Sequence, residues 1–231
     1  MNKLHFTSLD STNNYLKNNY KSLENYTFVS ADVQSDGKGR NNRKWISENG
    51  KNLLFSLLIL DKQLFKSYKE ISILTAYAIL KVLKKSGISD LKIKWPNDIY
   101  VGDKKICGIL LESVCKNEME CLIVGAGLNV NEDSFNGEYR TLPTSLKCEL
   151  KKDINIDSLK DDIYNEIINI LEDVKNNKNH YLDICEYDYL KGKEAIYDGN
   201  KIIIKGIDED YSLKIIKDNK EHNIDSGEIV L

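Results

Sequence analysis

The residues best suited to chemistry lie in one short segment, Gln34–Trp45. Gly37 and Gly39 stand one residue apart, and two lysines and two arginines fall between positions 38 and 44. Glycine allows backbone N–H groups to approach a ligand closely, and lysine and arginine donate charge-assisted hydrogen bonds to phosphate or carboxylate oxygens. Trp45 adds an apolar wall on which a ligand could stack. The segment therefore favours a loop that closes on a small anion, and a solvated basic turn is the alternative that its spacing leaves open.

Two familiar phosphate-binding loops do not fit this segment. A P-loop requires Ser or Thr after its Gly-Lys pair, whereas Gly37-Lys38 is followed by Gly39. A dinucleotide fingerprint requires a third glycine and a helix directly after it, whereas position 42 is Asn. We instead expect residues 35–44 to be disordered without a ligand, because only a bound anion would relieve the repulsion among their positive charges.

Further polar side chains follow predicted strands that would carry them to one place. A strand over residues 3–9 precedes Ser11, Thr12 and Asn13, and this polar group either caps the next helix, with Asp10 or Ser11 at the cap, or faces a ligand. A second strand, over residues 26–34, ends at the basic segment.

The stretch around Pro96 is a predicted break in the sheet. Proline donates no ladder hydrogen bond, so the strand before it must end or bulge there and leave Asn97 and Asp98 at the interruption. An ordinary turn explains the same residues. Lys105 precedes the next strand, where a lysine is either simply exposed or reaches into a cleft. A later apolar strand, over residues 120–130, ends in small residues that allow a ligand or another backbone to approach closely.

The remaining patterns predict an α+β fold with two parts. Residues 52–60 form an almost wholly apolar run, typical of a strand covered on both faces. A capping box at Ser67–Glu70 and a cap at Asp157 are expected to open two amphipathic helices. We expect a mixed β-sheet catalytic domain flanked by helices over residues 1–188, and about five short strands forming a small SH3-like β-barrel over residues 189–231.

Composition limits the class of protein. The chain has 231 residues, a net charge of −3 and an isoelectric point near 5.7, which argues against nucleic acid as the main partner. The five cysteines show no C-x-x-C spacing and the three histidines are scattered, so no protein-built metal site is expected. Neither a signal peptide nor a membrane span is predicted, and a reducing cytoplasm is the expected location.

Six motifs, in order along nearly the whole chain, resemble those of the biotin protein ligases (biotin–[acetyl-CoA-carboxylase] ligases). They are Ser11-Thr12-Asn13, Gln34 to Trp45, Lys94 to Asp98, Lys104-Lys105 before Cys107 to Glu112, Gly125 to Asn129, and Gly227-Glu228-Ile229. Lys38 replaces the usual arginine of the family, which keeps the charge but not the planar fork. Asn42 replaces a glycine, and asparagine tolerates the left-handed backbone better than most residues. Without a DNA-binding segment before Met1, the resemblance implies the short, non-repressor form.

The resemblance implies an ATP-dependent ligase that makes biotinyl-5′-AMP and then transfers biotin to a lysine of a carrier domain. Lys105 and Arg40 would be catalytic. The biotin site would comprise Ser11, Thr12, Asn13, Gln34, Lys38, Gly39, Arg40 and Lys105. The nucleotide site would comprise Arg40, Arg43, Trp45, Asn97, Asn129 and Asn131. Asp98 is a further candidate, to receive the proton of the carrier lysine or to hold Mg²⁺.

The implied partners are biotin, ATP with its Mg²⁺, and the biotin carboxyl carrier protein domain of a carboxylase. Neither DNA nor a membrane is expected as a partner, and an exposed sheet edge could form a homodimer. Three other functions remain open: a lipoate or octanoate protein ligase on a related scaffold, a DNA-binding regulator, and a non-catalytic binding or dimerisation domain in which the basic loop is merely solvated.

Overall fold

The computed structural model describes residues 2–135 and 139–231, with the side chain of residue 42 left aside, and it contains two β-sheets. The larger sheet has seven strands in the order β1-β2-β3-β7-β6-β5-β4, and only the pairing of β1 with β2 is parallel. Its strands are β1 Lys3–Leu9, β2 Phe28–Gln34, β3 Leu53–Ile59, β4 Leu91–Lys94, β5 Asp98–Val101, β6 Lys104–Cys115 and β7 Met119–Leu128.

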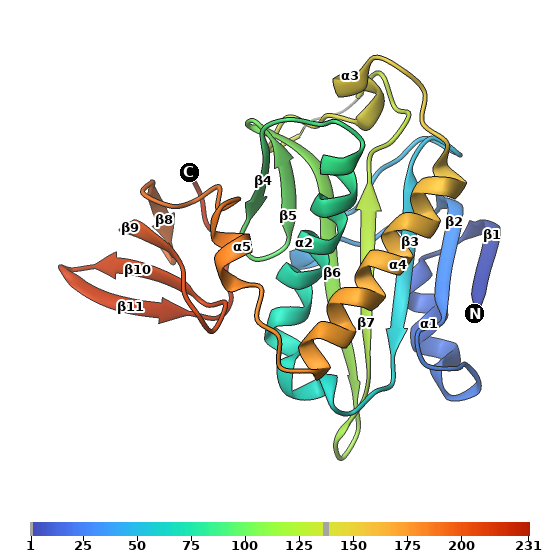
Figure 1. Ribbon diagram of the computed structural model, residues 1–231, viewed down its shortest axis with the longest axis horizontal. Helices are drawn as coiled ribbons and strands as arrows, with labels where there is room; N and C mark the ends of the chain where they lie inside the picture. The colour runs from blue at the N-terminus through green and yellow to red at the C-terminus, as the bar shows by residue number, and fades with distance from the viewer. Residues whose placement is uncertain (1, 136–138) are drawn as a thin grey trace.

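Helices cover both faces of this sheet (Figure 1). The described helices are α1 Thr12–Asn19, α2 Tyr68–Lys85, α3 Leu146–Leu150, α4 Ile156–Lys175 and α5 Tyr181–Cys185, with 3₁₀ turns at Tyr20–Ser22, Arg40–Asn42 and Leu64–Ser67. The long helices α2 and α4 lie side by side across one face, and α1 packs on the other. A mixed sheet flanked by helices confirms this part of the predicted fold class.

Strand β3 is buried on both faces, as its apolar run predicts. Leu57 belongs to the main core that includes α2 and α4, whereas its neighbour Leu58 packs with Leu16 of α1 and Val29 of β2 in a second cluster. Adjacent strand residues point to opposite faces of a sheet. The alternation along β3 therefore joins the two layers of helices to one central strand.

The C-terminal part of the chain forms a separate four-stranded antiparallel sheet in the order β11-β10-β9-β8. Its strands are β8 Glu194–Tyr197, β9 Asn200–Ile207, β10 Leu213–Lys217 and β11 Lys220–Ile224. The final residues return to it, since Ile196 makes an isolated antiparallel bridge with Val230. This open strand order does not establish closure into an SH3-like barrel, which stays a prediction. The division of the chain into two domains between residues 188 and 189 also stays a prediction.

Main-chain hydrogen bonds join β4 to the segment that leads into the smaller sheet. Ile93 N donates to Tyr187 O at 2.7 Å, and Tyr189 N donates back to Ile93 O at 3.0 Å. The indole Nε1 of Trp95 donates to the carbonyl of Tyr211, in the connection between β9 and β10, at 2.9 Å. These bonds fix where the C-terminal residues meet the larger sheet.

Two predicted helix caps are wrong. Helix α4 is capped by Asn155, whose Oδ1 accepts a hydrogen bond from Ser158 N at 2.9 Å, and Asp157 lies inside the first turn, paired with Lys160. Helix α2 does begin after Ser67, but Ser67 makes no side-chain cap bond. The preceding 3₁₀ turn runs directly into α2 and supplies backbone carbonyl acceptors instead, so the capping box is not needed.

Replacement of Leu57 by alanine should lower the free energy of unfolding by about 2–5 kcal/mol, because Leu57 is fully buried and its loss leaves a cavity. Urea denaturation followed by circular dichroism measures the change. Leu182→Ala, at a side chain that is 77% exposed, is the matched control and should shift stability by less than about 0.5 kcal/mol. Equal effects of the two substitutions would contradict the described core.

Candidate active site

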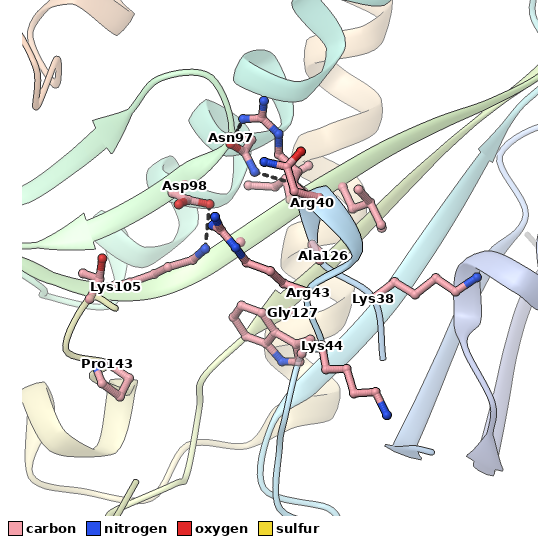
Figure 2. Close-up of a pocket in the computed structure, with 18 of the residues that line it drawn as sticks. Lys38, Arg40, Arg43, Lys44, Asn97, Asp98, Lys105, Ala126, Gly127 and Pro143 are labelled. Carbon is pink, nitrogen blue, oxygen red and sulfur yellow. Dashed lines mark hydrogen bonds and ion pairs between the residues drawn. The ribbon is translucent and has the colours of Figure 1, made fainter. Parts of the chain in front are cut away.

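Chain segments far apart in the sequence meet around one cavity of about 550 Å³. This volume lies in the range of sites that enclose small organic ligands. Of the residues predicted for the site, those that line the cavity are Ser11, Thr12, Asn13, Gln34, Lys38, Gly39, Arg40, Arg43, Trp45, Asn97, Asp98, Lys105 and Asn129. Figure 2 shows several of them converging from the basic loop, the β4–β5 turn and the mouth of β6.

One end of the cavity is lined by neutral polar groups. The backbone N–H of Thr12 donates to Gln34 Oε1 at 2.7 Å, and the Thr12 hydroxyl lies 3.1 Å from the same oxygen. Ser56, from the middle of β3, places its hydroxyl 2.6 Å from Thr12 Oγ1. Ser11 stands at the N-cap position of α1, makes no side-chain cap bond, and lines the cavity. This end suits a small uncharged group that offers both donors and acceptors.

Glycines on β6 and β7 let large side chains lie directly on the sheet. A Cβ atom on Gly127 would overlap the indole of Trp45, and one on Gly125 would overlap the amide of Asn13. A Cβ on Gly108 would come within 2.9 Å of Lys105 Nζ. The sequence predicted that these small residues allow another group to approach closely. In the structure those groups are the side chains of Asn13, Trp45 and Lys105, and Trp45 forms a wall of the cavity.

The basic loop, residues 35–44, is anchored to segments distant in sequence. Arg40 Nη1 donates to Asn97 Oδ1 and Arg40 Nη2 donates to the carbonyl of Gly227, both at 2.9 Å. Burial lowers the pKa of Arg40 from its ordinary value, and the negative charge of Asp98 opposes that effect. Arginine keeps its proton across the physiological range, so Arg40 is a permanent, partly desolvated cation at the cavity.

Lys105 reaches into the same cavity from the start of β6. Its Nζ lies 2.8 Å from Asp98 Oδ1 and 5.6 Å from the centre of the Trp45 ring, and Figure 2 shows the ion pair. Lys38 is placed differently, because its Nζ donates to Asn14 Oδ1 at 2.7 Å. Arg40 and Lys105 are thus brought together, whereas the ammonium of Lys38 is tied to the first turn of α1.

Asn129 and Asn131, both predicted for the nucleotide, differ in their surroundings. Asn129 lines the cavity, with its Nδ2 donating to Thr144 O at 2.9 Å. Asn131 does not line it, because its amide exchanges two hydrogen bonds with the backbone of Ile154. The structure therefore ties Asn131 to the backbone just before α4 and does not bring it to the cavity.

Several residues in or beside the cavity were missed from the sequence. Ser56 contacts Thr12 from behind the cavity without lining it, and it had a signal, as the polar residue inside an apolar strand. Glu228, part of the final Gly-Glu-Ile motif, accepts hydrogen bonds from Arg43 Nη2 at 2.7 and 2.8 Å and also forms an ion pair with Arg140. Arg140 had no signal, because nothing local distinguishes a cavity arginine in an irregular loop from a solvated one.

Two kinds of structure are absent from residues 2–135 and 139–231. There is no group of three or more His, Cys, Asp or Glu side chains that could hold a metal ion. No helix in these residues combines the length and apolar character that crossing a membrane requires.

Comparisons with known proteins agree with this geometry. The family model described as "Biotin/lipoate A/B protein ligase family" matches residues 5–129, more than half of the chain. The "Bifunctional ligase/repressor BirA" of Escherichia coli K12 is 35% identical over 140 residues, which cover 58% of this chain and 44% of that protein. BirA of Bacillus spizizenii is 34% identical over 123 residues, covering 52% and 38%. The matches thus span less than half the length of these relatives.

A solved structure resembles the whole chain. It is that of a biotin protein ligase from Aquifex aeolicus in complex with biotin and ATP, with a TM-score of 0.87 and 28% sequence identity. The alignment covers 99% of this chain and 97% of that one.

Replacement of Gly127 by alanine should displace the Trp45 ring, because the added Cβ would overlap it. Tryptophan emission should shift to longer wavelength and acrylamide quenching should rise. Gly39→Ala is the control, since its Cβ would meet only ordinary contacts, 3.5 Å from Arg43 O. An unchanged spectrum in Gly127→Ala would show that the indole does not lie on β7.

Proposed function

The chain belongs to the biotin/lipoate A/B protein ligase family, and we propose that it activates biotin with ATP and transfers it to a lysine of a biotin carboxyl carrier protein domain. The observation that carries the proposal is the cavity itself, which joins a neutral polar end to two converging cations, Arg40 and Lys105. The likeness to the Aquifex aeolicus ligase with biotin and ATP supports it.

In the first step, a carboxylate oxygen of biotin attacks the α-phosphorus of ATP. A new C–O–P linkage forms, the bond to the β-phosphate breaks, and pyrophosphate leaves with biotinyl-5′-AMP remaining. Two anions must approach each other, so the barrier falls most when fixed cations neutralise both. Lys105 would bridge the carboxylate and the α-phosphate, and Arg40 would hold their outer oxygens.

In the second step, the amine of the carrier lysine attacks the acyl carbon of the mixed anhydride. The C–O bond breaks, AMP leaves, and an amide forms after the amine loses a proton. Asp98 is the carboxylate nearest to this chemistry, since it already contacts Lys105 Nζ at 2.8 Å. We propose that it accepts that proton once Lys105 engages the phosphate.

The ring of biotin would occupy the neutral polar end formed by Ser11, Thr12, Asn13 and Gln34, with Lys38 and Gly39 beside its side chain. The cyclic urea of biotin can pair with these groups, whereas the dithiolane of lipoate would leave them unpaired, and unpaired buried polar groups are costly. The polar end thus favours biotin over lipoate.

The nucleotide would lie under Trp45, between Arg43, Asn97 and Asn129. The indole Nε1 of Trp45 is buried and has no hydrogen-bond partner in the described part of the chain, which is a position for an acceptor on the ligand. Asn131 is left out of this assignment because of its contacts with Ile154.

Mg²⁺ would arrive with ATP and neutralise phosphate charge, held mainly by phosphate oxygens. The cavity offers two carboxylates for it, Asp98 and Glu228, and both are paired with cations here. Oxygen donors of this kind fit the ion, and no dedicated protein cage is required.

The carrier domain of an acetyl-CoA or pyruvate carboxylase is the proposed acceptor, and a cytoplasmic location is part of the proposal. Self-association would use β1, which ends the larger sheet and pairs only with β2 among the described strands. The opposite end is less open, because β4 bonds to residues 187–189.

Mass spectrometry of a carrier domain incubated with this protein, MgATP and either biotin or lipoate tests the proposed activity. The expected result is a mass increase of one biotinyl group on one lysine, with little or no product from lipoate. A lipoyl product, or no pyrophosphate exchange with either acid, would overturn the proposal.

Lys105→Ala should slow biotin-dependent ATP–pyrophosphate exchange by about 100-fold or more, because it removes the cation placed between the two reacting anions. The neighbouring exposed lysine, Lys104, supplies the control: Lys104→Ala should leave the rate within about threefold. If both variants exchange at the wild-type rate, Lys105 has no part in the reaction.

A further inference from the structure

Two charged residues lie behind the polar end of the cavity without lining it. Glu112, on β6, accepts a hydrogen bond from Lys17 Nζ at its Oε1, at 2.7 Å. Its other oxygen, Oε2, accepts one from Asn13 Nδ2 at 2.8 Å. Neither Glu112 nor Lys17 is among the residues around the cavity, and the proposed reaction gives them no role.

The carboxylate of Glu112 determines which way the Asn13 amide faces. A charged carboxylate can only accept hydrogen bonds, so the amide must turn its NH₂ group toward Glu112. Its oxygen then faces Ser56, whose hydroxyl lies within hydrogen-bond distance of Asn13 Oδ1. Asn13 is 3% exposed and lies on the bare backbone of Gly125, so it has little freedom to choose another partner.

The orientation of the Asn13 amide determines which hydroxyls donate and which accept at the polar end of the cavity. With its proton committed to Asn13, the Ser56 hydroxyl can only accept at its 2.6 Å contact with Thr12 Oγ1, so the single hydroxyl proton of Thr12 points to Ser56. The oxygen of Gln34 accepts the backbone N–H of Thr12, and the Thr12 hydroxyl oxygen keeps a lone pair for an N–H donor of a ligand. Gln34 Nε2 has no partner among the described residues and is therefore left as a donor for a ligand carbonyl.

Glu112 is suited to this task at neutral pH. Burial alone would raise its pKa, but the hydrogen bonds from Lys17 and Asn13 outweigh burial and lower the pKa below its ordinary value. The group remains an ionised acceptor in the range where cells work.

We propose that Glu112, oriented by Lys17, is a positioning residue that fixes the donor and acceptor pattern of the Ser56 and Thr12 hydroxyls so that Thr12 accepts from a ligand N–H, and so selects a cyclic urea over a dithiolane. This inference rests on the proposed biotin ligase function, because it names the part of the substrate that the pattern recognises. Glu112 and Lys17, which lie outside the cavity, would thus determine whether the site binds biotin or lipoate.

The Glu112→Gln variant tests whether Glu112 determines which groups donate and which accept at the polar end. The Lys17 ammonium needs an acceptor, so it holds the glutamine oxygen and turns the glutamine NH₂ toward Asn13. Asn13 must then rotate and present its own NH₂ to Ser56, whose hydroxyl proton turns to Thr12, so the Thr12 hydroxyl becomes a donor. We expect the KM for biotin to rise about tenfold and discrimination against lipoate to fall, with kcat and the KM for ATP nearly unchanged.

Removal of Lys17 should rescue the same variant. In Lys17→Met/Glu112→Gln the glutamine is free to turn its oxygen back to Asn13, so biotin affinity should recover to within about threefold of the wild type. A merely structural role would make the double variant no better than the single one. Glu118→Gln, in the exposed Lys62–Glu118 pair, is the charge-matched control and should leave biotin binding unchanged.

Isothermal titration with biotin, and separately with lipoate, measures these affinities, and circular dichroism checks that each variant is folded. If Glu112→Gln does not fold, the double variant Asn13→Asp/Glu112→Gln replaces it. In that variant the glutamine donates to the new carboxylate, whose second oxygen still accepts from Ser56. Its affinity for biotin should exceed that of Asn13→Asp alone. Wild-type protein that binds no biotin would refute the proposed function. Wild-type binding with an unaffected Glu112→Gln, or with no rescue, would overturn the inference alone.

Discussion

Positive charge concentrated around one cavity is the constraint on which the rest of the structure depends. Like charges at close range repel strongly where water is excluded, yet this protein gathers several there. Each is held by a different partner: Arg40 by an amide oxygen and a carbonyl, Lys105 by Asp98, and Arg43 by Glu228. The partners come from β5, the β4–β5 turn and the C-terminal residues. Each cation thus already has a partner within the protein, and an anionic ligand would compete with that partner.

The glycines of β6 and β7 meet a second requirement, that bulky groups lie flat on the central sheet. The Trp45 ring occupies the space above Gly127, and Asn13 occupies the space above Gly125. Both strands are paired on either side, so the sheet is a rigid floor. A rigid floor matters for a site that must place two ligands within bonding distance.

The C-terminal segment takes part in the site although its sheet is separate. Gly227 supplies a carbonyl to Arg40, and Glu228 pairs with Arg43 and Arg140. The basic loop is thus held between the two sheets, and the bonds around β4 fix their relation. Loss of the C-terminal sheet would therefore disturb the cavity as well as that sheet's own core.

Local sequence determined the elements and most of the cavity, because the signals were short-range. The apolar run of β3 predicted a strand buried on both faces, Pro96 predicted the break that leaves Asn97 at the cavity, and the glycines beside cations marked a loop that lines the cavity. What the sequence left open was the choice of partner for each polar side chain. Asn155 rather than Asp157 caps α4, Asn131 binds the Ile154 backbone, and Arg40 bonds to Gly227, 187 positions away. A polar group takes whichever partner the fold brings within about 3 Å, and only the tertiary structure decides which one that is.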